Sequence, residues 1–253
     1  MTHRPLFAAN WKCNKTPDEA RAYLDDFLNP AEALVARADI ALLPPFIAIE
    51  TVFDGLGKSS IGLGAQDCYW ERSGAFTGEV SAAMLASIGC EYCVVGHSER
   101  RRLFGETDED VARKVSALLA VDVTPIVCIG ESLEEHRDGA TVQRVMQQIA
   151  DGLGHLDDDQ RAALVVAYEP VWAIGTGLAD DPESANTTIG LIRQALGGLA
   201  DARMLYGGSM NAGNAMAFCA QPNIDGGLVG SASLDPSGFL KLIEAGSQLR
   251  HEG

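Results

Sequence analysis

Short apolar segments rich in β-branched residues alternate with longer amphipathic stretches along the whole chain. The short segments are expected to be strands, and the longer ones are expected to be helices that bury one face. In the stretch after Thr107, for example, apolar residues recur three or four positions apart at Val111, Val115, Leu118 and Leu119. The expected strands are Leu6–Asn10, Asp39–Leu43, Ile61–Gln66, Tyr92–Val95, Thr124–Ile129, Leu164–Tyr168, Arg203–Tyr206 and Gly227–Val229.

These strands divide the 253 residues into eight units of about 32 residues each, close to the length of a βα unit. No linker rich in Ser, Pro or Gly interrupts them, so residues 1–253 are expected to form one domain. The pattern predicts an α/β fold, a closed (β/α)8 barrel with eight parallel strands and an outer ring of helices. The number of units alone leaves an open, doubly wound sheet as the alternative. In a closed barrel, the loops that follow the strands carry the function.

Several helices are expected to begin with acidic capping residues. Thr16-Pro17-Asp18-Glu19 combines a capping hydroxyl, a proline and a glutamate three residues after the cap, and Asp181-Pro182 and Asp235-Pro236 also place an acid before a proline. Thr107 precedes three acidic residues, where the helix dipole stabilises negative charge. Much of the acidic charge is therefore expected on the outer ring of helices.

The composition is that of a globular protein, with 47% hydrophobic and 21% charged residues. The net charge of −16 argues against nonspecific binding to nucleic acid or to an anionic membrane, so an anionic ligand would have to be bound by local groups. No apolar run is long enough to span a membrane, and no apolar signal segment follows the N-terminus. We therefore expect a cytoplasmic protein with no nucleic-acid or membrane partner.

The six cysteines are too sparse for a disulfide scaffold and are expected to be reduced thiols: Cys13, Cys68, Cys90, Cys93, Cys128 and Cys219. Cys90 and Cys93 form a C-x-x-C pair, for which a zinc or redox role is the alternative to buried packing. Packing is favoured, because there is no second cysteine pair and no histidine at ligand spacing. No metal site and no cofactor are expected.

Three of the expected post-strand loops carry residues suited to proton chemistry. Asn10 and Lys12 follow the first strand, His97 follows the fourth, and Glu169 follows the sixth. Each has an ordinary alternative, as a surface lysine, a structural histidine or a capping acid. Glu169 precedes a stiff Pro-Val-Trp segment and a Gly-Thr-Gly tip, so residues 170–180 suggest a lid.

Small residues after the last two strands suggest a phosphate site. Gly207-Gly208-Ser209 and Gly230-Ser231 allow backbone N–H groups to approach an anion at the barrel position where phosphate commonly binds. A base, an electrophilic histidine, a lysine and a phosphate cradle are what proton abstraction next to a carbonyl requires. The expected substrate is a small phosphorylated carbonyl compound.

The chain resembles the triosephosphate isomerase family along nearly its whole length, with motifs in the same order and spacing. The matching motifs are Asn10-Trp11-Lys12, Gly64-Ala65-Gln66, Thr77-Gly78-Glu79, Gly96-His97-Ser98-Glu99-Arg100-Arg101, Phe104-Gly105-Glu106-Thr107, Tyr168 to Gly177, Tyr206-Gly207-Gly208-Ser209 and Leu228-Val229-Gly230. The resemblance implies a TIM barrel that interconverts dihydroxyacetone phosphate and D-glyceraldehyde 3-phosphate through an enediol(ate), in glycolysis and gluconeogenesis.

The resemblance also implies roles for individual residues. Glu169 would shuttle the carbon-bound proton, a neutral His97 would polarise the carbonyl, and Lys12 with Asn10 would stabilise the developing negative charge. The phosphate would be bound by Gly175, Ser209, Gly230 and Ser231. Glu99, Tyr206 and Cys128 would support the site, Glu99 by holding Lys12 and Tyr206 by latching the closed lid together with Ser209.

A homodimer is expected from the long loop Asp67–Gly78, which carries Tyr69, Trp70 and Phe76. In the family this loop docks into a second identical subunit, near Cys13 and Thr77. The chain departs from the family at Ser231 and Lys15, where glycine is common, and in the hinge sequence Leu178-Ala179-Asp180.

Two alternatives remain at this point: a barrel that acts on a larger sugar phosphate, and a noncatalytic phosphate-binding or adhesion barrel. The short Gly-Thr-Gly lid tip disfavours the first. The presence of a base at Glu169 disfavours the second, because a pure binder has no need of one.

Overall fold

The computed structural model of the chain describes residues 3–173, 180–197 and 202–248. The strands in this part of the chain are β1 Leu6–Asn10, β2 Asp39–Leu43, β3 Gly62–Ala65, β4 Tyr92–Val95, β5 Thr124–Ile129, β6 Val165–Tyr168, β7 Arg203–Tyr206 and β8 Gly226–Val229. All eight expected strands are confirmed, with ends that differ by at most one residue. Each strand pairs in parallel with its neighbours in sequence order, and β8 pairs with β1, so the sheet is a closed barrel.

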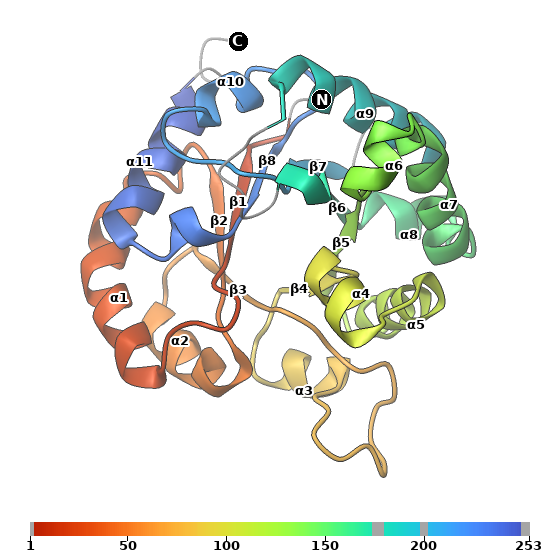
Figure 1. Ribbon diagram of the computed structural model, residues 1–253. Helices are drawn as coiled ribbons and strands as arrows, with labels where there is room; N and C mark the ends of the chain where they lie inside the picture. The colour runs from red at the N-terminus through yellow and green to blue at the C-terminus, as the bar shows by residue number, and fades with distance from the viewer. Residues whose placement is uncertain (1–2, 174–179, 198–201, 249–253) are drawn as a thin grey trace.

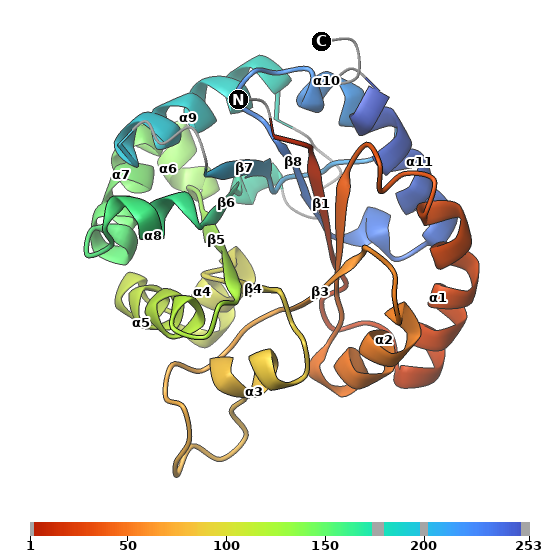
Figure 2. The ribbon, with the colours of Figure 1, turned by 180° about the vertical axis from the view of Figure 1, so that it is seen from behind.

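Helices surround the barrel on all sides, as Figures 1 and 2 show from opposite directions. They are α1 Pro17–Ala31, α2 Ile49–Leu56, α3 Ala82–Ser87, α4 Ser98–Phe104, α5 Asp108–Leu119, α6 Leu133–Arg137, α7 Thr141–Leu153, α8 Asp158–Ala162, α9 Pro182–Ala195, α10 Ala215–Cys219 and α11 Pro236–Ser247, with the 3₁₀ turns η1 Phe46–Ala48, η2 Val171–Ala173 and η3 Ser231–Ser233. The expected (β/α)8 TIM barrel is therefore confirmed, and the open sheet is excluded.

Closure of the barrel depends on a close approach between β1 and β8. Leu6 pairs with Gly226 and Phe7 with Gly227. Gly226 has a φ of 129°, and a Cβ atom there would lie 2.0 Å from the carbonyl oxygen of Leu6. Only glycine avoids both the backbone strain and the steric clash at this position.

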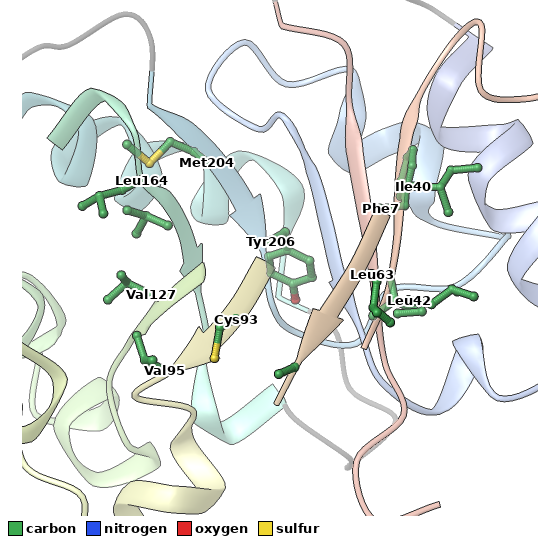
Figure 3. Packing of buried hydrophobic residues seen from close by; sticks show 14 of the residues in the cluster. Phe7, Ile40, Leu42, Leu63, Cys93, Val95, Val127, Leu164, Met204 and Tyr206 are labelled. Atoms are coloured by element: carbon green, nitrogen blue, oxygen red, sulfur yellow. The ribbon is translucent and has the colours of Figure 1, made fainter. Parts of the chain in front are cut away.

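Apolar side chains on the two faces of the strands form two packed layers, as the alternation along a strand requires. The barrel interior is filled by Leu6, Ala8, Ala41, Leu43, Val94, Ile126, Cys128, Val165, Ala167, Leu205 and Leu228. The other face packs against the helices, and Figure 3 shows part of this larger cluster, including Phe7, Ile40, Val127 and Met204. The strands are buried on both faces, which is why they read as continuous apolar runs rather than as polar-apolar alternation.

The acidic helix starts are where the sequence predicts them. Thr16 and Thr107 each form a capping box with the acid three residues later, and Asp181 and Asp235 cap α9 and α11. Cys90 and Cys93 are buried, and all six cysteines are free thiols. Among the described residues, no group of His, Cys, Asp and Glu side chains is arranged to hold a metal ion, and Cys90 and Cys93 belong to no such group. Within the described ranges, no helix has the length and apolar character needed to cross a bilayer.

Candidate active site

A cavity of about 450 Å³ opens at the carboxyl ends of the strands. Its lining brings together residues from the loops after β1, β4, β6, β7 and β8, including Asn10, Lys12, His97, Glu169, Ser209, Gly230 and Ser231. The expected catalytic residues and three of the four expected phosphate-binding residues therefore share one site. The fourth, Gly175, lies outside the described residues.

Glu169 is almost completely buried, directly after β6. One carboxylate oxygen, Oε1, lies 3.1 Å from Nε2 of His97, and the other, Oε2, accepts a hydrogen bond of 2.9 Å from the backbone N–H of Ser98. Gly130 makes room for this segment, since a Cβ there would lie 1.7 Å from the carbonyl oxygen of Glu169. The carboxylate is thus oriented by the loop that carries the histidine.

His97 stands at the N-cap of α4, and its contacts define which nitrogen carries the proton. The backbone N–H of Glu99 donates to Nδ1 of His97 at 3.2 Å. A ring nitrogen that accepts a hydrogen bond carries no hydrogen, so a neutral ring has its N–H on Nε2, toward Glu169. The Nε2 atom of His97 is therefore the ring nitrogen that faces the carboxylate of Glu169.

Lys12 is held in place from three directions. Its Nζ donates to Oε1 of Glu99 at 2.7 Å, its backbone N–H donates to Oδ1 of Asn10 at 3.0 Å, and its carbonyl accepts from the Gln66 amide at 2.9 Å. Partial burial acts to raise the pKa of Glu99, but the hydrogen bond and charge of Lys12 outweigh it and the pKa lies below its usual value. Glu99 therefore stays ionised and fixes the lysine at the cavity.

Two contacts hold the flanks of the expected lid. The hydroxyl of Ser209 donates to the carbonyl of Ala173 at 2.7 Å, and the hydroxyl of Tyr206 accepts from the backbone N–H of Asp180 at 3.0 Å. Residues 174–179, which include the Gly-Thr-Gly tip and the hinge residues Leu178 and Ala179, lie outside the described residues. Ser209 and Tyr206 thus contact the residues on either side of this gap, Ala173 and Asp180.

Two of the three departures from the family pattern, Lys15 and Ser231, differ in backbone conformation. Lys15 has a φ of 73°, a conformation that favours glycine, and its Nζ lies 4.7 Å from the centre of the Tyr23 ring. Ser231 begins η3 and is not among the residues with positive φ. Serine therefore fits its backbone conformation without strain.

Cys128 lies inside the barrel, fully buried. Burial, together with the nearby charge of Glu169, raises the pKa of its thiol well above the usual value. A neutral buried thiol is a poor nucleophile, so the contribution of Cys128 to the site is packing.

A buried ionic cluster supports the His97 loop, and the sequence analysis did not identify it. Nζ of Lys114 lies 2.6 Å from Oδ1 of Asp67 and 2.9 Å from Oε1 of Glu106, and Arg100 contacts both acids. Glu106 also accepts from the backbone N–H of Gly96, the residue before His97, at 3.3 Å. The feature of the sequence that could have revealed this cluster is the position of Lys114 within the apolar stripe of α5.

A second unexpected residue is Glu131, which is fully buried after β5. It accepts hydrogen bonds from Nε1 of Trp172 at 2.9 Å and from the Tyr168 hydroxyl at 3.1 and 3.2 Å. No spacing pattern distinguishes it from the other acids of its segment, because its partners come from β6 and the turn after it.

A closed parallel barrel with a carboxylate, an imidazole, a lysine and small residues at one mouth defines a class of isomerases that move a proton next to a carbonyl. Comparison with known proteins gives the particular family. The profile of the family described as "Triosephosphate isomerase" matches residues 5–246. The chain belongs to the triosephosphate isomerase family and is an isomerase.

Curated relatives cover nearly the whole chain. The triosephosphate isomerase of Symbiobacterium thermophilum is 50% identical over 252 residues, covering 97% of this chain and 98% of the relative. Those of Moorella thermoacetica and Endomicrobium trichonymphae are 45% and 44% identical, each covering 95% of this chain and 98% of the relative.

The buried cluster predicts that Lys114→Met destabilises the fold strongly. Removing the cation leaves the carboxylates of Asp67 and Glu106 buried with less compensation, which should cost about 3–5 kcal/mol. Urea unfolding would measure the loss. The matched control is Arg21→Met, whose partner Asp18 is exposed and whose loss should cost less than about 1 kcal/mol. Equal losses in the two variants would contradict the structural role of Lys114.

Proposed function

We propose that the protein interconverts dihydroxyacetone phosphate and D-glyceraldehyde 3-phosphate, with Glu169 as the base, His97 as the electrophile and Lys12 as the cation that stabilises the intermediate. The observation that carries the proposal is the contact of 3.1 Å between Oε1 of Glu169 and Nε2 of His97. It sets a proton acceptor and a neutral N–H donor side by side at one wall of the cavity, as abstraction of a proton next to a carbonyl requires.

This arrangement accounts for the path of the proton and of the electron pair. The Glu169 carboxylate takes a proton from the carbon next to the carbonyl of dihydroxyacetone phosphate, and the electron pair of that C–H bond forms the C=C bond of the enediolate. The carbonyl oxygen gains negative charge, which the Nε2–H of His97 and the ammonium group of Lys12 stabilise. A proton then passes from the hydroxyl oxygen on C1 to the oxygen on C2, relayed by Nε2 of His97. Return of the proton from Glu169 to C2, the former carbonyl carbon, uses the electron pair of the C=C bond, and the C1–O bond becomes the carbonyl of glyceraldehyde 3-phosphate.

The phosphate group would bind at Ser209, Gly230, Ser231 and Gly175. The first three line the cavity, where backbone N–H groups and the nearby Lys12 suit an anion. A lid over residues 170–180 would exclude water, which strengthens the electrostatic stabilisation and protects the enediolate from losing its phosphate. The contacts of Ser209 and Tyr206 with the flanks of this segment support that role.

The first test is a coupled assay with glyceraldehyde 3-phosphate on the wild type and on Glu169→Gln. The wild type should turn over equally with and without a chelator. Glutamine keeps the size of the side chain but cannot accept the proton, so kcat should fall by at least about 10²–10⁴-fold. Turnover of Glu169→Gln near that of the wild type would refute the assignment of the base.

His97→Gln should lower kcat/KM by roughly 10²–10³-fold, the loss expected when one donor to a developing oxyanion is removed. The matched control is His155→Gln, because His155 is exposed on the outer ring and bonds to Ser116. An unchanged rate for His97→Gln, or an equal loss in His155→Gln, would assign the electrophilic role to another group.

We also propose a homodimer formed around the loop Asp67–Gly78, which projects from the barrel in both overall views (Figures 1 and 2). The loop is folded on its own aromatic residues, with Tyr69 centred 4.2 Å from Trp70 and 4.7 Å from Phe76. Tyr69 and Trp70 are half-buried by these contacts, and Phe76 is exposed.

Phe76, Thr77 and Cys13 are exposed and remain the expected interface residues. Other large apolar side chains are also exposed, Phe46, Ile47, Met84 and Phe104 among them. Burial of these side chains against a second copy would remove apolar surface that is unusual on a monomer.

Sedimentation of the wild type at micromolar concentration should therefore give the mass of a dimer. Phe76→Glu should weaken association by at least about tenfold, because it places a charge in the apolar contact. Val142→Glu is the matched control, since Val142 is similarly exposed but lies on α7. A fully active wild-type monomer, or equal weakening by both variants, would contradict the proposed interface.

A cytoplasmic location is part of the same proposal. The six free cysteines fit a reducing compartment.

A further inference from the structure

The turn that carries Lys12, residues 11–16 between β1 and α1, has an unusual backbone. Lys12 has a φ of 53° and Lys15 a φ of 73°. In the described part of the chain, Asp122 is the only other residue besides glycines with a positive φ. The Cβ atom disfavours this left-handed region, so a residue stays there only where its surroundings compensate for the strain. Two such residues in one short turn require contacts that hold the turn together.

Two contacts close this turn on Trp11. The carbonyl of Trp11 accepts a hydrogen bond of 2.6 Å from Nδ2 of Asn14, and Nζ of Lys15 lies 5.4 Å from the centre of the Trp11 ring. Trp11 is fully buried, and its backbone N–H donates to the carbonyl of Leu43 at 3.2 Å. Lys12 is therefore enclosed between residues that meet at one buried side chain.

The ammonium group of Lys15 also lies over Tyr23 of α1. Its Nζ is 4.7 Å from the centre of the Tyr23 ring, which meets the Trp11 ring edge-on with the centres 4.7 Å apart. Further rings continue the row, with Phe27 centred 5.2 Å from Tyr23 and 5.7 Å from Phe239 of α11. All four rings are buried, and α1 and α11 lie side by side (Figures 1 and 2). Lys15 thus rests on a packed aromatic platform.

The acids nearest to Lys15 in charge interaction already have other partners. The Glu19 carboxylate accepts from the backbone N–H of Thr16 at 2.7 Å, and the Asp235 carboxylate accepts from that of Gly238 at 2.7 Å. Partial burial lowers the pKa of Lys15, and the charges of Glu19 and Asp235 act in the opposite direction. The aromatic faces, which attract a cation through their quadrupoles, therefore direct the ammonium group.

We infer that Lys15 is a positioning residue for the isomerase reaction, whose ammonium group on the rings of Trp11 and Tyr23 fixes the turn that holds Lys12 at the cavity. The inference rests on the proposed role of Lys12. Lys15 itself is not among the described residues that line the cavity. At a position where glycine is common in the family, lysine accepts a disfavoured backbone conformation and makes a contact that glycine cannot make.

Loss of this charge should reduce activity without removing any group that touches the substrate. Other conformations of the turn then become more populated, and kcat/KM falls in proportion to the fraction of molecules in which Lys12 is correctly placed. For a partly exposed cation on an aromatic face, the attraction corresponds to a change of roughly two- to fivefold.

The first measurement is kcat/KM for glyceraldehyde 3-phosphate in the wild type, Lys15→Gln, Lys15→Arg and Lys15→Gly. Glutamine keeps the Cβ atom but lacks the charge, so the value should fall roughly two- to fivefold. Arginine keeps the charge, stacks on aromatic faces and should match the wild type. Glycine relieves the backbone strain but lacks the cation, so it should not restore the rate. Lys241→Gln, at an exposed lysine of α11, is the matched control for net charge and should leave the rate unchanged.

The second measurement is hydrogen exchange of residues 10–16, followed by mass spectrometry, which does not depend on turnover. The backbone N–H groups of Trp11 and Lys12 are bonded to the Leu43 carbonyl and to Oδ1 of Asn10, so they exchange when the turn opens. Exchange there should be roughly two- to fivefold faster in Lys15→Gln. It should be unchanged in Lys15→Arg and Lys241→Gln, and β5 should exchange equally in all variants.

Unchanged exchange in Lys15→Gln, equal losses of kcat/KM in Lys15→Gln and Lys15→Arg, or a wild-type rate in Lys15→Gly would overturn the inference. Faster exchange in Lys15→Gln with an unchanged kcat/KM would also overturn it, because the contact would then be structural only. A wild type without isomerase activity would contradict the proposed function, and hydrogen exchange would still decide whether Lys15 fixes the turn.

Discussion

The hydrogen bonds between β1 and β8 close the sheet, and the position of every functional group depends on that closure. Gly226 permits it, because any side chain there would collide with the Leu6 carbonyl. Once the ring is closed and all strands run parallel, their carboxyl ends share one mouth. Lys12, His97 and Glu169, which are at least 72 residues apart in the sequence, then lie around one cavity.

The distribution of charge resolves an apparent conflict between an acidic protein and an anionic substrate. Acids that cap helices lie on the outer ring, where the helix dipole stabilises them. The acids buried near the mouth are each compensated: Glu169 by the Ser98 N–H, Glu106 by Lys114 and Arg100, and Glu131 by indole and phenol donors. The net charge therefore says little about the local field that a phosphate meets.

Contacts from several elements of the barrel hold the residues on either side of the proposed lid. Its first flank is fixed by Glu131 and Ser209, which follow β5 and β7, and its second flank by Tyr206 at the end of β7. These partners lie on the rigid barrel.

The sequence by itself determined the elements and the chemistry of the site. Strand positions follow from local apolar runs, helix starts from capping residues such as Thr16 and Thr107, and the expected Glu169, His97 and Lys12 from motifs at strand ends. These signals are readable because each depends on neighbours a few residues away.

Only the tertiary structure decided the hydrogen-bond partners of the His97 ring, the ion pairs of Lys114 and the role of Glu131 as an anchor for Trp172. It also showed that the ring of Tyr69 packs against those of Trp70 and Phe76 within its own loop. In each case the partners are remote in sequence or depend on the orientation of one side chain. Burial changes the energy of a charge or a hydrogen bond according to which partner lies within about 3 Å, and a periodic pattern carries no information about that distance.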